Sequence, residues 1–480
     1  MTLARWSPAG FLAAYVLVSF SATPNPMLAL WRPLLVGIGV AVALQLVLSV
    51  ALRDRDRAAL VASAAVLVLT AAWVPLAVAA TAATWLLIIG WRRRRRGEPD
   101  LGISAAMLSR NLAVFALAFA AVSAIPVLSW GVTSWQAAHP DARGQAVAGT
   151  PDIVVLLVDG YPRSDALLEM FGINNAPFEA ALAGRGFGVA AHSRSNYTST
   201  WTTLASMFHG KYVEEIPRLQ PAPTDPAEQY RRVMLALEDS PVLDGLRRLG
   251  YEVVTVPSPF ESAVLTGADR ILSPPQLSSF ELSLLQHSLL GRVAFSVAPG
   301  IVFDQHRGRL ESTLALLTDE VARPSAVPRF VFAHLLAPHA PVVYNADGSA
   351  ADPVSCFPAC SIYGFASAAD WGGFPGQLEH VNQMVLDAVD AIIAGDPDAI
   401  VIVMSDHGSH RTGTDAANAF RNFFAARVPG NPTLFEDDVT PLTVLARLAG
   451  IEFRSGDPYR GWASADLQPL TLTPWTGPLP

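Results

Sequence analysis

Four long uncharged runs occupy most of the first third of the chain, and they constrain the fold more than any other feature. These runs cover residues 9–20, 33–52, 58–91 and 112–130. Arginine-rich clusters at residues 53–57 and 92–96 separate them. A helix needs roughly 20 apolar residues to cross a bilayer, and the mean hydropathy of the whole chain is +0.34. We therefore predict that residues 1–135 form a transmembrane domain.

The charged clusters predict how these runs cross the membrane. Because clusters of arginine stay on the cytoplasmic side, residues 58–91 should cross an even number of times. They would form a hairpin that turns near Pro75, which gives about five helices, a cytoplasmic N-terminus and a multi-pass location in the cytoplasmic (inner) membrane. The alternative is one long tilted helix over residues 58–91, which leaves one arginine cluster on the outer side. A signal peptide alone is excluded, since several apolar runs follow the first.

The rest of the chain has the pattern of an α/β domain. Residues 136–150 are polar, contain Pro and Gly, and are predicted to be a linker. Residues 151–480 then form the extracytoplasmic domain. Predicted strands at residues 153–158, 251–256, 330–336 and 399–404 alternate with segments of helical spacing, such as residues 377–394. Alternating strands and helices predict a three-layer αβα domain with a parallel sheet.

Two of the predicted strands end in residues that bind metal ions. Asp159 follows the first strand, and Asp406 with His407 follows the last. Residues just beyond the carboxyl ends of strands line the ligand sites of open α/β sheets. Carboxylate oxygens and imidazole nitrogens suit Zn²⁺ or Mn²⁺. Each motif alone is commonly an ordinary turn, but together they predict a divalent metal site.

A hydroxyl-rich segment, residues 195–211, supplies a candidate nucleophile for this site. Its hydroxyls, including Thr198 and Thr200, precede an apolar helical stretch. The unpaired N–H groups at the start of a helix favour an anion, and a hydroxyl beside a metal ion loses its proton more easily. The alternative is that these hydroxyls only cap the helix.

In this order, Asp159, Thr200, Asp406 and His407 resemble the sulfatase-like branch of the alkaline phosphatase superfamily, in particular lipoteichoic acid synthase and phosphoethanolamine transferases. The resemblance covers residues 151 to about 462, and the predicted five-helix anchor is similar to that of lipoteichoic acid synthase. It implies that these four residues bind one divalent ion and that Thr200 is also the nucleophile. Two registers of the family's helical signature select Thr200, with Thr198 as the alternative.

The resemblance also implies residues that contact the substrate. His339 matches the family's active-site histidine, which contacts the transferred group or the leaving oxygen. His334 is expected to pack within the sheet or to support the site. Contacts to the anionic group of the substrate are predicted for His410, Arg411, Arg421 and Lys211.

One departure from the sulfatases changes the expected chemistry. Sulfatases that form formylglycine carry Cys or Ser at the nucleophile, followed by a Cys/Ser-x-Pro-x-Arg pattern. Here residues 200–204 are Thr-Trp-Thr-Thr-Leu. Threonine cannot give that aldehyde by the usual oxidation, so sulfate ester hydrolysis by the formylglycine route is disfavoured.

We therefore expect a membrane-anchored, metal-dependent phosphotransferase that acts through a threonine-linked intermediate. It would move a phosphoglycerol- or phosphoethanolamine-type head group onto an envelope lipid or glycan. A phosphate or sulfate ester hydrolase and a non-catalytic envelope-binding protein are the alternatives. The net charge of −8 gives no support to nucleic-acid binding, and no feature of the sequence indicates an oligomeric state. Cys356 and Cys360 are predicted to form a disulfide outside the cytosol.

Overall fold

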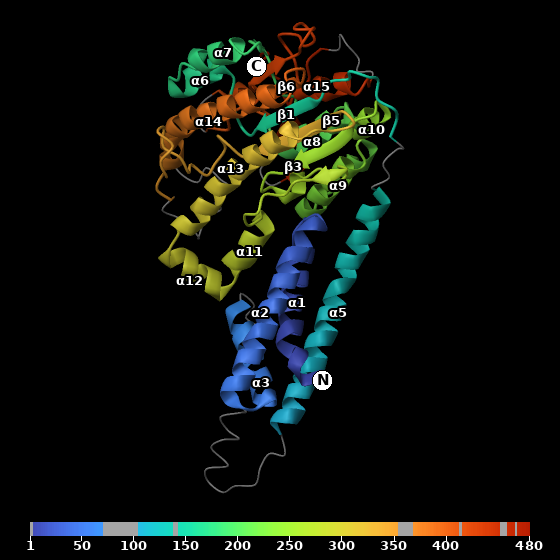
Figure 1. The fold of residues 1–480 in the computed structure, drawn as a ribbon, viewed down its shortest axis with the longest axis vertical. Helices are drawn as coiled ribbons and strands as arrows, with labels where there is room; N and C mark the ends of the chain where they lie inside the picture. The colour runs from blue at the N-terminus through green and yellow to red at the C-terminus, as the bar shows by residue number, and fades with distance from the viewer. Residues whose placement is uncertain are drawn as a thin grey trace. The chain divides into compact units, whose positions relative to one another are not determined.

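The chain divides into two compact units in the computed structural model, which describes residues 3–70, 104–137, 143–353, 368–411, 415–451, 458–465 and 468–480. The first unit comprises residues 1–135 together with Ser278–Ala298. Its helices are α1 (Ser7–Ala22), α2 (Leu28–Leu52), α3 (Arg55–Thr70), α5 (Ala105–Ala137), α11 (Ser279–His287) and α12 (Leu289–Val297). Helices α11 and α12 come from within residues 151–480 of the sequence, but they group with the N-terminal helices (Figure 1).

Two helices of the first unit, α2 and α5, are long and apolar enough to cross a membrane. Helix α1 is apolar but has 16 residues, as does α3. Pro75 and the predicted second arm of the hairpin lie outside the described residues, as do Cys356 and Cys360. The five-helix arrangement and the disulfide therefore stay predictions.

The second unit is a mixed α/β domain built on one sheet. Among the described residues, seven strands follow the order β2-β7-β6-β1-β5-β3-β4. The central strands β6, β1, β5 and β3 are parallel, while β7 pairs antiparallel with β6 and β2. The strands are β1 (Ile153–Val158), β2 (Gly188–Val189), β3 (Glu252–Val256), β4 (Arg270–Ile271), β5 (Arg329–Leu335), β6 (Ile400–Met404) and β7 (Phe424–Arg427). A separate hairpin consists of β8 (Trp462–Ala465) and β9 (Gln468–Pro474).

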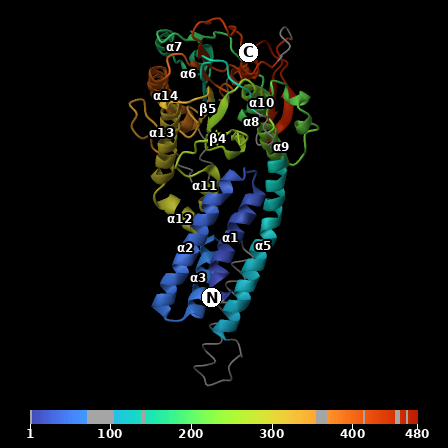
Figure 2. The same ribbon diagram turned by 45° about the vertical axis from the view of Figure 1, so that its right-hand side comes forward.

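Helices cover both faces of this sheet (Figures 1 and 2). All six residues of β1 are buried, which explains why its sequence is continuously apolar instead of alternating. One face packs against α8, α10 and α15, and the other against α13, which contacts α14. The helices of this unit are α6 (Ser164–Phe171), α7 (Ala176–Ala183), α8 (Thr200–His209), α9 (Pro226–Glu238), α10 (Pro241–Arg248), α13 (Gly300–Ala322), α14 (Ala368–Gly395) and α15 (Pro441–Leu448).

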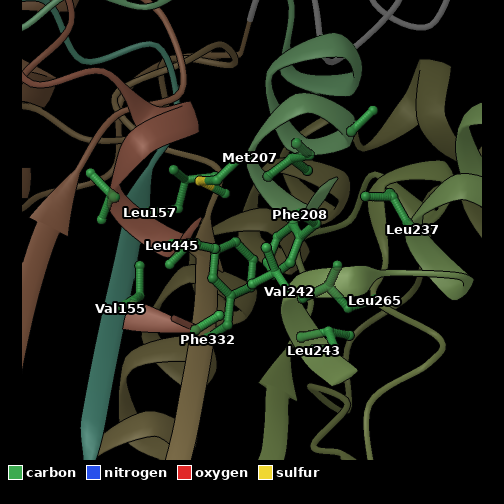
Figure 3. Close-up of a cluster of buried hydrophobic side chains, with 14 of the residues drawn as sticks. Val155, Leu157, Met207, Phe208, Leu237, Val242, Leu243, Leu265, Phe332 and Leu445 are labelled. Carbon is green, nitrogen blue, oxygen red and sulfur yellow. The ribbon is translucent and has the colours of Figure 1, made fainter. Parts of the chain in front are cut away.

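The main hydrophobic core lies between the sheet and α8. Met207 and Phe208 of α8 point toward Val155 and Leu157 of β1 and Phe332 of β5 (Figure 3). The rings of Phe208 and Phe332 meet edge to face, with centroids 5.2 Å apart. Because α8 is fixed to the sheet through its C-terminal half, its N-terminus is held in a defined position.

Replacing Phe208 by alanine should therefore destabilise the protein. The ring is fully buried, and we expect the free energy of unfolding to fall by about 3–5 kcal/mol. Urea titration of the full-length protein in detergent, followed by tryptophan fluorescence, measures this change. The matched control is Leu168→Ala on α6, where the side chain is 60% exposed and a change of about 0.5 kcal/mol or less is expected. Equal effects of the two substitutions would contradict this account of the core.

Candidate active site

Three neighbouring parallel strands end at one edge of the sheet, and the candidate site lies there. Asp159 follows β1, while Asp406 and His407 follow β6, the neighbour of β1 in the sheet. All three side chains are buried, and each offers a ligand atom within 4.8 Å of the others. The parallel order of the strands thus brings together groups that are almost 250 residues apart in the sequence.

A glycine turn after β1 joins the two strand ends. Gly160 has a φ of +64°, a left-handed conformation that residues with a side chain rarely adopt. A Cβ atom at this position would lie 3.5 Å from His339 Cδ2 and 3.7 Å from His407 Cε1. The Gly160 N–H donates to Asp406 Oδ1 over 3.1 Å. The turn therefore fixes one oxygen of Asp406 and leaves room for two imidazole rings.

Thr200 brings its hydroxyl to this cluster from the first position of α8. Its Oγ1 atom lies 3.4 Å from Asp159 Oδ2 and 3.5 Å from His407 Nε2. Ser199, the residue before the helix, is extended, so the first N–H groups of α8 have no partner within the helix. The other candidate hydroxyl, that of Thr198, accepts a hydrogen bond from the Ser464 N–H at 3.1 Å. Of the two threonines, Thr200 is the one in contact with the Asp and His side chains.

The ligand atoms of the cluster fit a divalent metal ion. Asp159 Oδ1 and Asp406 Oδ2 are both buried and have no hydrogen-bond partner among the described residues, an arrangement that is costly unless another group satisfies them. His407 Nδ1 lies 2.7 Å from the Gly408 carbonyl oxygen. That contact places the proton on Nδ1 and directs the Nε2 lone pair toward the carboxylates.

The charges of the cluster shift its pKa values in opposite directions. Burial alone would raise the pKa of Asp159, but the nearby imidazoles of His339, His334 and His407 outweigh burial and lower that pKa to about 2. Burial alone would lower the pKa of His407, but the Asp406 and Asp159 carboxylates raise it above its usual value. The site therefore favours the ionised form of the Asp159 carboxylate, beside a His407 imidazole that binds a proton more readily than usual.

Metal affinity should consequently depend on pH through His407. A metal ion must displace the proton from Nε2, and the raised pKa of His407 extends this competition above the usual histidine range. Affinity is expected to fall about tenfold per pH unit below that pKa, while Asp159 adds nothing near neutrality because its pKa is about 2. Calorimetry in buffers of different ionisation enthalpy counts the released protons. About one proton should be released at pH 6, and release of none would contradict the assigned ligand.

Two further histidines flank Asp159. His334, in β5, lies with Nε2 2.8 Å from Asp159 Oδ2, so it supports the carboxylate directly. The signal in the sequence is a single histidine within an otherwise apolar strand. His339 is half-buried, and its backbone N–H donates to the Asp159 carbonyl oxygen at 3.2 Å. Its Nδ1 is 2.9 Å from the Ala340 carbonyl oxygen, which sets the orientation of the ring.

The four residues predicted to bind the anionic group do not all lie together. The His410 ring is 4.9 Å from that of His407 and is exposed. Arg411 and Arg421 are engaged by α6: Arg411 donates to the Met170 carbonyl oxygen and Arg421 to Glu169. Lys211 is exposed beyond the C-terminus of α8, the end opposite Thr200. Thus His410 adjoins the cluster, the arginines are paired beside it, and Lys211 is separated from it by the length of the helix.

Comparison with known proteins gives similarity to solved structures only. No family model matches the chain, and no curated protein matches it in sequence. The C-terminal periplasmic domain of EcEptC from Escherichia coli, also solved in complex with Zn, is 12% identical with a TM-score of 0.44, covering 70% of this chain and 97% of that chain.

Two further structures are similar at the same level. The integral membrane protein lipooligosaccharide phosphoethanolamine transferase A from Neisseria meningitidis is 13% identical with a TM-score of 0.39, covering 89% of this chain and 77% of that chain. The phosphonate monoester hydrolase of Agrobacterium radiobacter is 13% identical with a TM-score of 0.41, covering 65% and 80%.

Proposed function

We propose that this protein is a metal-dependent phosphotransferase of the alkaline phosphatase superfamily that uses Thr200 as its nucleophile. The observation that carries the proposal is the position of the Thr200 hydroxyl, at the start of α8 and within 3.5 Å of both Asp159 and His407. A structural cap has no need of a buried carboxylate pair and an imidazole around it. Phosphoryl transfer needs this set: a hydroxyl, a metal site and unpaired N–H groups facing an anion.

Asp159, Asp406, His407 and Thr200 would hold the metal ion, and their oxygen and nitrogen donors favour Zn²⁺ or Mn²⁺. When bound, one such ion lowers the pKa of a hydroxyl beside it and offsets the charge of the phosphate oxygens. The chain itself contributes the orientation of the hydroxyl, because α8 is packed against the sheet. All four side chains are buried, so the surrounding packing fixes their positions.

The transfer takes two steps. In the first, Thr200 loses its proton to solvent, and its oxygen bonds to phosphorus as the bond from phosphorus to the donor's alcohol oxygen breaks. The departing oxygen takes a proton from His339, which leaves a phosphodiester on Thr200. In the second, an acceptor hydroxyl gives its proton back to His339 and its oxygen bonds to the same phosphorus as the bond from phosphorus to Thr200 breaks, and the Thr200 oxygen recovers a proton from solvent. Water in place of the acceptor gives hydrolysis.

His339→Gln should show the role of this histidine in protonation. Loss of a general acid typically costs about 10²–10⁴-fold in turnover. The loss should be much smaller with a p-nitrophenyl phosphodiester, because nitrophenolate departs without a proton. Rates with both leaving groups, together with metal content, provide the test. Equal losses with the two substrates would show that His339 acts in some other way.

The first unit supports a membrane location for the proposed reaction. Helices α2 and α5 are long and apolar enough to cross a bilayer, and we propose a multi-pass anchor in the inner membrane with residues 151–480 outside the cytoplasm. A phospholipid is then an accessible donor. We propose a phosphoglycerol- or phosphoethanolamine-type head group as the transferred unit and an envelope lipid or glycan as its acceptor.

Turnover of full-length protein in phospholipid nanodiscs tests this function. With Zn²⁺ or Mn²⁺ supplied, discs containing phosphatidylethanolamine and phosphatidylglycerol should accumulate diacylglycerol. Head groups found on an added glycan acceptor indicate a transferase, and free phosphorylated head groups indicate a hydrolase. If folded, metal-loaded protein released no diacylglycerol from either lipid, the proposed donor class would be wrong.

A further inference from the structure

Helix α12 carries large apolar side chains on one side, and this side is exposed instead of packed against the other helices of the first unit. Their exposed fractions are 45% for Leu289, 58% for Leu290, 55% for Val293 and 81% for Val297. At 3.6 residues per turn, these four side chains fall within an arc of about 100°. The buried residues of α12, Gly291 and Phe295, lie on the opposite side. A helix with this division has an apolar face that nothing within the described part of the chain covers.

The preceding helix, α11, packs along α1. The rings of Phe280 and Phe20 meet edge to face at a centroid distance of 5.6 Å. One turn further along α11, the Leu284 carbonyl oxygen accepts a hydrogen bond from the Tyr15 hydroxyl at 2.7 Å. Phe280 and Leu284 are both buried in this contact, within a cluster that also includes Phe20. Helix α11 therefore runs from near the end of α1 back toward its middle.

An ion pair at the start of α2 fixes α11 further. Arg32 of α2 donates to both carboxylate oxygens of Glu281, with Nε 2.6 Å from Oε1. Glu281 also forms the capping box of α11 with Ser278. The neighbouring Trp31 is 56% exposed, and tryptophan is enriched at membrane–water interfaces.

The contacts of α11 give the depth that α12 reaches. The turn at residues 23–27 separates α1 from α2, and the Trp130 indole N–H of α5 donates to the Asn25 carbonyl oxygen there. Tyr15 lies seven residues before the last residue of α1, Ala22, which corresponds to about 10 Å at 1.5 Å per residue. Interfacial helices bury their apolar face by about 5–10 Å. Leu284, which bonds to Tyr15, is therefore at the depth where such a helix lies.

The bend between α11 and α12 is set by close packing. Gly291 approaches the Leu285 carbonyl group so closely that any side chain at position 291 would collide with it. The Ser288 hydroxyl accepts a hydrogen bond from the Gly291 N–H at 2.9 Å and caps α12. In both ribbon views the two helices meet at this bend beside the other helices of the first unit (Figures 1 and 2). The outward direction of the apolar face is thus built into the fold.

From these contacts we infer that α11 and α12 form a lipid-binding hairpin whose α12 face enters the outer leaflet of a phospholipid bilayer. The inference rests on the membrane location proposed above and extends it to a segment that lies between β4 and α13 in the sequence. Like this face, the exposed side chains of α2 include large apolar ones, such as Val36 and Val40. The proposed lipid-binding face contains no residue of the candidate active site.

Accessibility of nitroxide labels tests this inference in the full-length protein. Single labels are placed at Leu290 and Val293 in a C356S/C360S background, reconstituted in vesicles of phosphatidylethanolamine and phosphatidylglycerol. A label at Val40 on α2 is the lipid control, and one at Asp347, an exposed residue of the second unit, is the water control. Oxygen concentrates in lipid and a nickel chelate in water, so the ratio of the two accessibilities reports the surroundings of each label.

We expect the oxygen-to-nickel ratios at Leu290 and Val293 to be severalfold above that at Asp347 and close to that at Val40. If the ratios at both positions equalled that at Asp347 while the ratio at Val40 still reported lipid, the inferred lipid-binding hairpin would be wrong and the membrane location would stand. If the labels at Leu290 and Val293 were inaccessible to both nickel and oxygen, a protein partner would cover this face, and the inference would be wrong as well. If Val40 itself were in water, the proposed membrane location would fail.

Discussion

Thr200→Ala is expected to lower turnover on the order of 10⁴-fold, because it removes the proposed nucleophile. The remaining activity would come from water acting on a substrate that the metal and α8 still orient. The fold should persist, since among the described residues the Thr200 hydroxyl makes only two long contacts, of 3.4 and 3.5 Å, to Asp159 and His407. Steady-state rates with the same lipid donor, measured beside metal content, give the result.

Two other variants sharpen this prediction. Thr200→Ser keeps a hydroxyl at the same position and should recover much of the activity. Thr203→Val, one turn further along α8, removes a buried hydroxyl whose partner is the Tyr197 carbonyl oxygen at 3.5 Å, and it should leave turnover nearly unchanged. A large loss in Thr203→Val with little loss in Thr200→Ala would place the nucleophile elsewhere.

Asp159→Asn is expected to have the second largest effect, on metal binding. The substitution removes a proposed anionic ligand whose Oδ1 has no hydrogen-bond partner among the described residues. Because loss of supporting groups around a metal costs about 10–100-fold in affinity, loss of a direct ligand should exceed about 10²-fold. Competition with a fluorescent zinc chelator measures the affinity, and turnover should fall with it.

The matched control for this change is Asp165→Asn. Asp165 belongs to the same unit, but its carboxylate is half-exposed and pairs with Arg163 at 2.7 Å. Metal affinity should not change in this variant. An unchanged affinity in Asp159→Asn would show that the metal binds without Asp159 and would remove the basis for the proposed site.

The strands that carry the site were predictable because burial on both faces makes them continuous apolar runs. The predicted strand at residues 153–158 coincides with β1, and the predicted strand at residues 399–404 differs from β6 (Ile400–Met404) by one residue. The edge strand β2 and its neighbour β7 were missed. β2 has two residues and β7 four, and their antiparallel pairing joins segments more than 200 residues apart, for which the local pattern gives no signal.

The choice between neighbouring hydroxyls needed the structure. Thr198 and Thr200 are equivalent as helix-starting threonines, and the resemblance to a family selected Thr200 only by register. In the folded chain Thr198 is occupied by the Ser464 N–H, and Thr200 faces Asp159. The two threonines are distinguished by a contact to a residue 266 positions away, so the local sequence carries no information about which of them is free to face the site.

The predicted anion contacts show a related difficulty. A basic side chain near a motif can bind an anionic substrate only when it is not already paired with an acidic side chain or a carbonyl oxygen of the protein. Glu169 and Met170, at the end of α6, bind Arg421 and Arg411, and nothing in the spacing of the arginines indicates this. Likewise, Lys211 is near Thr200 in sequence, but α8 carries it to the other end.

Mass spectrometry of Thr200 during turnover tests the central claim most directly. Full-length protein in nanodiscs with Zn²⁺ and phosphatidylethanolamine is quenched in acid and digested without adding an acceptor. The peptide that contains Thr200 should carry a phosphoethanolamine group, and this mass should be absent from Thr200→Ala. Turnover without any adduct on Thr200, or an adduct on Thr198 in its place, would contradict the account.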